Sequence, residues 1–212
     1  WLKHQARQHD EWLLFDQDEC WFSRFAQPTL SAWTPSGNAL RLVVREPKRN
    51  EPEKALACFG AVRQDTEQVC LSFSAGQPDS EQTWLFIIAL LAIARQEGKR
   101  VVVIIWDNAT WHKSQRLRSW IRLYNQAAKQ AGEPRLITHL LPLKSPWLNP
   151  IEKLWRWLRQ AVLKLHRLAD DWPELQRRVN AFLDQFATGS HELLRYVGLL
   201  GDGTLAQALH VA

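Results

Sequence analysis

Three acidic residues, far apart along the chain, occupy positions that an α/β fold could bring together. Asp18 closes a first apolar run, Asp107 directly follows a β-branched run, and Glu152 lies in the first turn of a predicted helix. Ligands of open α/β sheets bind outside the carboxyl ends of the strands, where Asp107 is expected. Converging carboxylates repel one another unless a cation lies among them, and Mg²⁺ prefers such oxygen ligands. Two ions roughly 3.5–4 Å apart can bind the attacking and leaving oxygens of a phosphodiester.

Two of these acids also fit a purely structural interpretation. Asp107 is followed by Asn108, a residue type suited to cap the next helix, and Thr110 could serve instead. Asn149 and Glu152 have the spacing of an N-cap residue and the third helical position. The spacings alone therefore leave a helix start and a catalytic role open.

The first acid belongs to an acidic segment, residues 16–19. Successive side chains of an extended chain point to opposite faces, so Asp16 and Asp18 share one face and Glu19 lies on the other. We expect at least one of these acids to be simply solvated. Asp16 is a nearby alternative to Asp18 as the first acid.

The first third of the chain is predicted to consist of strands. Short apolar runs bounded by turn residues favour strands, and the acidic segment separates the first two. Residues 45–54 are polar and charged and predict an exposed loop. Strands are expected at residues 11–15, 20–25, 40–44, 55–62 and 68–73.

After a Ser/Gly/Pro-rich break at residues 74–78, helices and strands alternate. Asp79 or Ser80 caps the first helix, and glycines end the first two helices. Residues 101–106 (VVVIIW) are apolar on both faces, as in a strand covered on both sides. Helices are expected at 79–97, 110–131, 149–167 and 173–186, and strands at 101–106 and 135–140. This order predicts an α/β fold, a mixed sheet with antiparallel strands on one side, crossover connections on the other, and flanking helices.

The helix predicted from residue 149 has an apolar and a basic side. Ile151, Leu154 and Trp155 recur at spacings of three and four and indicate the buried side. Lys153 and Arg156 lie off that stripe. They form either an ordinary solvated surface or a basic ridge along a phosphate backbone.

Composition narrows the class of protein. The 212 residues are 46% apolar, enough for a core without disulfides, and three cysteines form no C-x-x-C pair. The longest apolar run has 11 residues, whereas a membrane-spanning helix needs roughly 20, so no membrane contact is expected. With no recognisable signal segment, we expect a cytoplasmic protein.

Charge and aromatic content indicate a polyanionic partner. The net charge of +5 and the pI of about 9.3 suit contact with nucleic acid. Most of the 12 tryptophans fall on apolar faces and are predicted to lie in the core. One or two exposed tryptophans could stack on bases.

Two segments resemble the catalytic core of the IS630/Tc1/mariner superfamily of DDE transposases. They are DNATWHK at residues 107–113 and LPLKSPWLNPIEKLW at residues 141–155. DECWF at residues 18–22 and WTPSG at residues 33–37 also fall where that family has its acidic strand and its Trp-x-Pro-x-Gly loop. The similarity covers roughly residues 11–167.

The resemblance implies an RNase H-like fold and a two-metal polynucleotidyl transferase. Asp18, Asp107 and Glu152 would then be the catalytic, metal-binding triad for two Mg²⁺ ions, with Mn²⁺ able to substitute. His112 matches a motif position and would contact phosphate or support a ligand from behind. The same role, in DNA binding or in support of the ligands, is implied for Lys113, Asn149, Lys153 and Arg156.

The resemblance also implies partners. DNA, as element ends and as target, is the expected substrate, and a homodimer is expected on DNA. The family's N-terminal helix-turn-helix region is not found ahead of the strands, so an upstream-encoded DNA-binding protein or a missing N-terminal domain is expected to supply end recognition. Residues 1–167 would form the catalytic domain and 168–212 a C-terminal helical extension, in a bacterial, nucleoid-associated setting.

A further departure and two alternatives accompany the resemblance. The 44 residues between Asp107 and Glu152 exceed the spacing typical of the Tc1 and mariner branches. A nuclease of the same fold that cleaves without strand transfer would need the same acids. A non-catalytic DNA-binding remnant of a transposase would keep the basic surface without metal-dependent chemistry.

Overall fold

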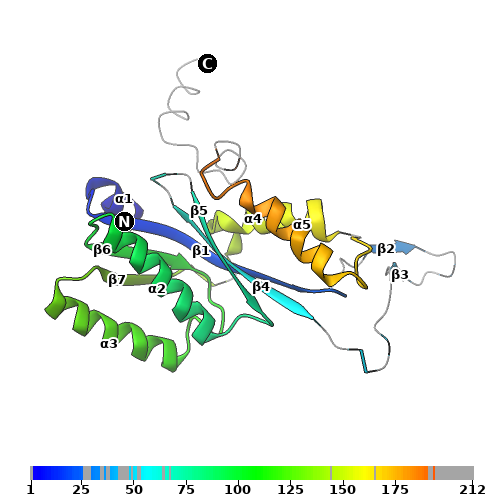
Figure 1. Cartoon of the computed structure of the whole chain (residues 1–212), viewed down its shortest axis with the longest axis horizontal. Coiled ribbons are helices and arrows are strands. Elements are labelled where there is room, and N and C mark those ends of the chain that lie inside the picture. Colours follow the sequence, from blue (N-terminus) through cyan, green and yellow to red (C-terminus); the bar gives the residue numbers. More distant parts are fainter. Residues whose placement is uncertain are drawn as a thin grey trace, which may run out of the picture.

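A five-stranded sheet in the order β5-β4-β1-β6-β7 forms the centre of the chain (Figure 1). The computed structural model describes residues 2–25, 30–33, 36, 39–42, 48, 50–51, 54–63, 65–66, 68–143, 145–164, 166–190 and 193. The strands are β1 (Trp12–Ser23), β4 (Ala55–Arg63), β5 (Val69–Ala75), β6 (Val101–Trp106) and β7 (Arg135–Leu140), and β2 (Leu30–Trp33) and β3 (Ala39–Leu42) pair separately.

The sheet is mixed, as the sequence predicts. β4 runs antiparallel to β1 and β5, whereas β6 runs parallel to β1 and β7. The two parallel connections each contain a helix, because parallel neighbours need a crossover. β6 is buried on both faces from Val102 onward, which confirms the interpretation of its apolar sequence.

Helices cover both faces of this sheet. Leu13 and Phe15 of β1 pack with α2 (Ser80–Gln96) and α3 (Gln115–Ala131). Cys20 and Phe22 point to the other face and pack with α4 (Ile151–Leu158) and α5 (Trp172–Asp184). The period of two along β1 therefore places these two pairs in separate clusters on opposite faces, and Leu14 belongs to a third cluster with Val103 and Ile105. A short helix, α1 (Leu2–Gln8), precedes β1.

β1 corrects the prediction of two strands separated by an acidic end. It is one strand of 12 residues, and residues 15–23 pair without a break with β4. The expectation of a solvated acid is also wrong, because Asp16 and Asp18 are 0% and 5% exposed and the Glu19 side chain is 1% exposed. Within this segment, Glu19 is paired with Trp111 and His112, which lie far along the chain.

Local signals placed α2 correctly and the next two helices only in part. Asp79 caps α2 by accepting hydrogen bonds from the Glu81 and Gln82 N–H groups. α3 begins at Gln115 and not at Thr110, and its cap is Ser114. Neither Asn108 nor Thr110 is the cap.

The helix predicted at residues 149–167 is shorter. α4 ends at Leu158, and a π-helix, η2 (Arg159–Leu163), follows it. The Lys164 N–H group donates to the Arg159 carbonyl, which closes this wider turn. α5 confirms the last predicted helix, with Asp171 as its cap.

Several predicted features lie wholly or mostly outside the described residues. They are the WTPSG loop, most of the charged loop at 45–54 and the segment from residue 194 onward. No helix in the described part combines the length and apolarity needed to cross a membrane.

Gly60 lets α4 approach the sheet closely. It pairs with Asp18 across β1 and β4. A Cβ atom at this position would lie 2.7 Å from the Ile151 Cδ1 atom and 2.8 Å from the Trp155 ring. The absence of a side chain at residue 60 therefore sets the distance between α4, which carries Glu152, and the strand that carries Asp18.

We expect Gly60→Ala to lower the free energy of unfolding by about 1–3 kcal/mol, because overpacking forces α4 away from the sheet. Adding Ile151→Val removes the nearest atom and should recover part of that loss. Urea denaturation of the single and double variants measures both effects. A Gly60→Ala variant as stable as the parent would contradict this close approach.

Candidate active site

Asp18 and Asp107 lie at the same edge of the sheet. The parallel pairing of β1 with β6 ends at Asp16 and Ile105, so Asp18 lies level with the residues that follow β6. Asp107 is the first of these residues. The sequence suggested that Asp18 closes a strand, and this prediction is wrong. Asp18 lies within β1, at the point where its neighbour β6 stops.

Glu152 reaches Asp18 from the first turn of α4. The two carboxyl groups share a hydrogen bond. Burial raises the pKa of Glu152, as does the charge of Asp107, while the Arg159 and Arg156 guanidinium groups oppose this rise. Burial also holds the pKa of Asp18 well above its usual range, and repulsion from Glu19, Glu152 and Asp107 adds to it.

The three acids are therefore neighbours without being a closed cluster. Among the residues that the structure describes, no three His, Cys, Asp or Glu side chains are grouped closely enough to hold a metal ion. Asp18 and Glu152 are in contact, and Asp107 acts on both through its charge. The Asp107 carboxylate is hydrogen-bonded to other groups.

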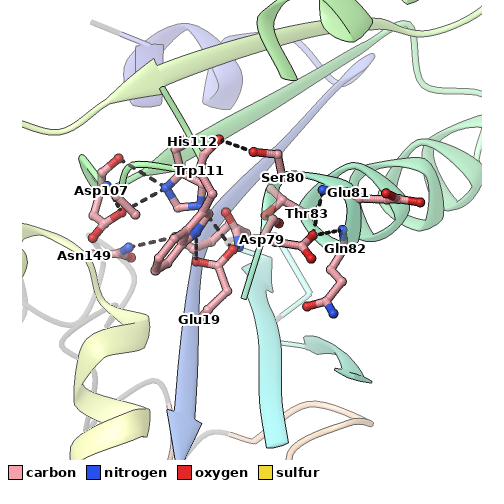
Figure 2. A network of polar contacts seen from close by, with 12 residues as sticks. Glu19, Asp79, Ser80, Glu81, Gln82, Thr83, Asp107, Trp111, His112 and Asn149 are labelled. Carbon is pink, nitrogen blue, oxygen red and sulfur yellow. Dashed lines mark hydrogen bonds and ion pairs between the residues drawn. The ribbon is translucent and has the colours of Figure 1, made fainter. Parts of the chain in front are cut away.

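His112 bridges two carboxylates at this edge (Figure 2). Its Nδ1 atom lies 2.9 Å from Asp107 Oδ1, and its Nε2 atom lies 3.1 Å from Glu19 Oε1. The ring is buried and stacks on Trp106 with centroids 4.5 Å apart. Burial lowers the pKa of His112, but Glu19 and Asp107 outweigh it and raise that pKa to about 10. Both ring nitrogens therefore carry protons and donate.

Glu19 is the far anchor of this bridge. Its Oε2 atom accepts a hydrogen bond from Trp111 Nε1 at 3.1 Å, and its Oε1 atom accepts one from Gln17 Nε2 at 2.9 Å. The Ser80 hydroxyl, at the start of α2, lies 3.2 Å from the Trp111 carbonyl oxygen. Figure 2 shows how these groups surround the turn that carries His112. Both carboxylate oxygens of Glu19 are therefore hydrogen-bonded within the protein.

The bridge fixes one oxygen of Asp107. Oδ1 accepts from His112 and from the Ala109 N–H group at 2.9 Å, while Oδ2 has no hydrogen bond to the described residues. Burial raises the pKa of Asp107, but the His112 and Ala109 hydrogen bonds outweigh it, and the pKa lies below its ordinary value. Asp107 is therefore an oriented, ionised carboxylate.

Asn149 corrects the capping interpretation of the α4 start. Pro150 occupies the N-cap position, and no side chain caps the helix. The Asn149 side chain is buried, and its Nδ2 group donates to the Gln17 carbonyl oxygen at 2.9 Å. It ties the start of α4 to β1, one residue from Asp18.

The basic residues near the three acids differ in exposure. One of them, Arg159, was not predicted from the sequence. Lys113 and Lys153 are half-buried and Arg156 is exposed. The charge of Arg159 opposes the rise in pKa that burial causes at both Glu152 and Cys20. The signal was present, because residues 152, 156 and 159 have the spacing of four and three that places side chains on one helical face.

Comparison with known proteins shows the family and the fold of this chain. A family model described as DDE superfamily endonuclease matches residues 15–176. The insertion element IS630 uncharacterized 39 kDa protein of Shigella sonnei is 27% identical over 166 residues, which are 77% of this chain and 43% of that protein. The chain thus spans less than half the length of this relative.

Solved structures show the same fold. The Mos1 mariner paired end complex with Mn matches 93% of this chain and 55% of its own, with a TM-score of 0.54 and 17% identity. The catalytic domain of Mos1 mariner transposase matches 93% of this chain and 81% of its own, with a TM-score of 0.52 and 15% identity. The predicted RNase H-like fold is confirmed.

The His112 bridge predicts a pH-dependent stability. The folded-state pKa of about 10 lies above the ordinary value of 6.5, so the bridge stabilises the fold fully below pH 6.5. That contribution is lost as the pH rises through about 10. In metal-free buffer, urea denaturation should show a parent-minus-His112→Gln difference in unfolding free energy that shrinks across this range. His139→Gln, at an exposed histidine of β7, is the control. A difference that does not vary with pH would contradict the bridge.

Proposed function

We propose that this chain, which belongs to the DDE superfamily of endonucleases, is the catalytic domain of a transposase that cleaves DNA and transfers the cut strand to target DNA. What supports this proposal is that Asp18 and Asp107 lie at the same sheet edge and that the charge of Glu152 acts on Asp18. These residues come from three separate segments, and their charges act on one another. Buried acids that repel one another are typical of sites whose task is chemical.

The donor set fits divalent cations with oxygen ligands. Asp18, Asp107 and Glu152 would hold two Mg²⁺ ions, with Mn²⁺ able to substitute, and a cation between them would relieve the repulsion that raises the pKa of Asp18. The related Mos1 complex was solved with Mn. When bound, such ions activate the attacking oxygen and stabilise the leaving oxygen of a phosphodiester.

The chain's own residues would position the reactants. Water attacks the phosphorus at the element end and frees a 3′-hydroxyl, and this hydroxyl then attacks a target phosphodiester. His112 and Glu19 keep Asp107 ionised with Oδ2 available. Asn149 holds α4 against β1. Positioning of this kind contributes to catalysis because it removes reorganisation from the reaction step.

DNA binding is proposed for the cationic surface beside the acids. Lys153, Arg156 and Arg159 follow Glu152 along α4 and η2, and Lys113 follows His112. The fold neighbours include a Mos1 strand transfer complex. We propose that the DNA comprises the element ends and the target, and that the chain forms a homodimer on DNA. End recognition is proposed for an N-terminal region or for a separate helix-turn-helix protein. The proposed setting is a bacterial cytoplasm, at the nucleoid.

We assign residues 1–167 to the catalytic domain and 168–212 to a helical extension. The described part of the extension supports a packed arrangement, because Leu175, Val179 and Leu183 of α5 share a hydrophobic cluster with Leu154 of α4.

Glu152→Gln tests the assignment of the triad. Loss of one anionic ligand should reduce Mn²⁺- or Mg²⁺-dependent cleavage by about 100-fold or more. The assay uses a plasmid that carries the DNA flanking the gene, and it scores nicking and joined products separately. Glu81→Gln, at an exposed carboxylate of α2, is the matched control. A Glu152→Gln variant that cuts as well as the parent would rule out the triad, and cutting without joined products would identify a nuclease.

Removing the charge of the bridging His112 or of its anchor Glu19 should weaken metal binding. Groups that orient metal ligands typically contribute 10–100-fold to affinity, so we expect losses of about that size for Glu19→Gln and His112→Gln. Electron paramagnetic resonance measures the free Mn²⁺, and circular dichroism checks that each variant is folded. Unchanged Mn²⁺ affinity in both folded variants would contradict this positioning role.

A further inference from the structure

Three large apolar side chains are exposed in the segment between β7 and α4. Leu143 and Trp147 are each 71% exposed and Leu148 is 46% exposed. Trp147 and Leu148 belong to the single 3₁₀ turn η1 (Pro146–Leu148). We call Leu143, Trp147 and Leu148 the η1 platform. A tryptophan is highly buried on average, so a Trp that keeps most of its surface in solvent is informative.

The segment that carries the η1 platform is fastened at both ends to the candidate active site. At its start, the Asn108 Nδ2 group donates to the Leu141 carbonyl oxygen, next to Asp107. At its end, the Asn149 Nδ2 group donates to the Gln17 carbonyl oxygen, next to Asp18. The Leu148 N–H group donates to the Ser145 carbonyl oxygen at 3.1 Å and closes the turn between them. The platform is therefore held beside the carboxylates.

Basic residues follow the η1 platform along the chain, beyond Glu152. The segment from Leu141 to Ile151 contains no acidic residue. Arg156 and Arg159 lie exposed on the next turns of the same stretch of chain. An exposed aromatic ring on a segment that is followed by guanidinium groups has the residue types with which proteins bind single-stranded nucleic acid, with cations along the phosphates and aromatic rings under the bases.

We propose that the η1 platform binds an unpaired nucleobase of the DNA strand next to the phosphodiester that is cut, with the Trp147 ring stacked on it. The inference rests on the proposed function and adds a contact to it. A stacked base fixes the strand relative to the carboxylates, and a base displaced from its pair exposes the ring face that Trp147 needs.

A second copy of the chain is a poorer occupant. Three exposed side chains offer far less than the roughly 20–30 residues a side of a stable protein interface. The neighbouring cations would also meet the basic surface of an identical chain, whose net charge is +5. A strand of DNA complements both the apolar and the charged parts.

The test is a double-mutant cycle that combines a substitution of Trp147 with the removal of a base from the DNA. Fluorescence anisotropy measures the affinity of the full chain, in a Glu152→Gln background that prevents cutting, for a duplex containing the cleavage site with flanking unpaired nucleotides. Trp147→Ala should weaken binding by about 10-fold, and Trp147→Phe should keep most of the affinity. An abasic nucleotide is then placed in turn at each unpaired position. At one position the abasic nucleotide should abolish the difference in affinity between the protein with Trp147 and the Trp147→Ala variant.

Leu123→Ala, at a 61% exposed leucine of α3, is the matched control and should bind as the parent does. Unchanged binding by Trp147→Ala would overturn the proposal, as would a loss that stays the same at every abasic position. A Trp147-dependent change of mass in solution without DNA would also overturn it and assign the platform to a protein contact. These outcomes are separate from the test of the triad, which is the cutting activity of Glu152→Gln.

Discussion

Repulsion between carboxylates at one edge of the sheet is the constraint on which the rest of this structure depends. Asp18 is almost fully buried, touches Glu152 and lies within reach of the charges of Asp107 and Glu19. Bringing like charges out of water costs free energy unless protons, cations or hydrogen bonds compensate. The fold compensates these charges in two different ways. Glu19 is paired with His112, whereas Asp18 and Glu152 share a hydrogen bond that a cation could replace.

Each neighbouring element contributes a specific restraint to this arrangement. The bare Cα of Gly60 lets α4 lie close to β4, and the amide of Asn149 fastens the start of that helix to β1. On the opposite face, the turn before α3 places His112 between Asp107 and Glu19. Because Asp18 and Glu19 are adjacent on one strand, they point to opposite faces, and a single strand supplies both a candidate ligand and the anchor of a second one.

Sequence patterns predicted the parts of the fold that depend on local signals. The apolar run of β6 and the Asp79 cap of α2 are examples, because burial period and capping are properties of neighbouring residues. The pattern failed where a distant partner decides. The acidic stretch of β1 remains a strand because Glu19 meets Trp111 and His112, more than 90 residues away. Asn149 has the spacing of a cap but bonds instead to Gln17, 132 residues away. The three acids could be named from motif resemblance, whereas the bridge could not.

The central claim is that Asp18, Asp107 and Glu152 together bind divalent ions. Anomalous diffraction from crystals of the full chain grown with Mn²⁺ tests it most directly, because the signal locates the metal independently of activity. We predict two peaks roughly 3.5–4 Å apart, between these three carboxylates, with Asp107 Oδ2 as a ligand and Oδ1 still bonded to His112. Manganese located elsewhere, with Asp18 and Glu152 still hydrogen-bonded to each other and Asp107 remote from them, would contradict it.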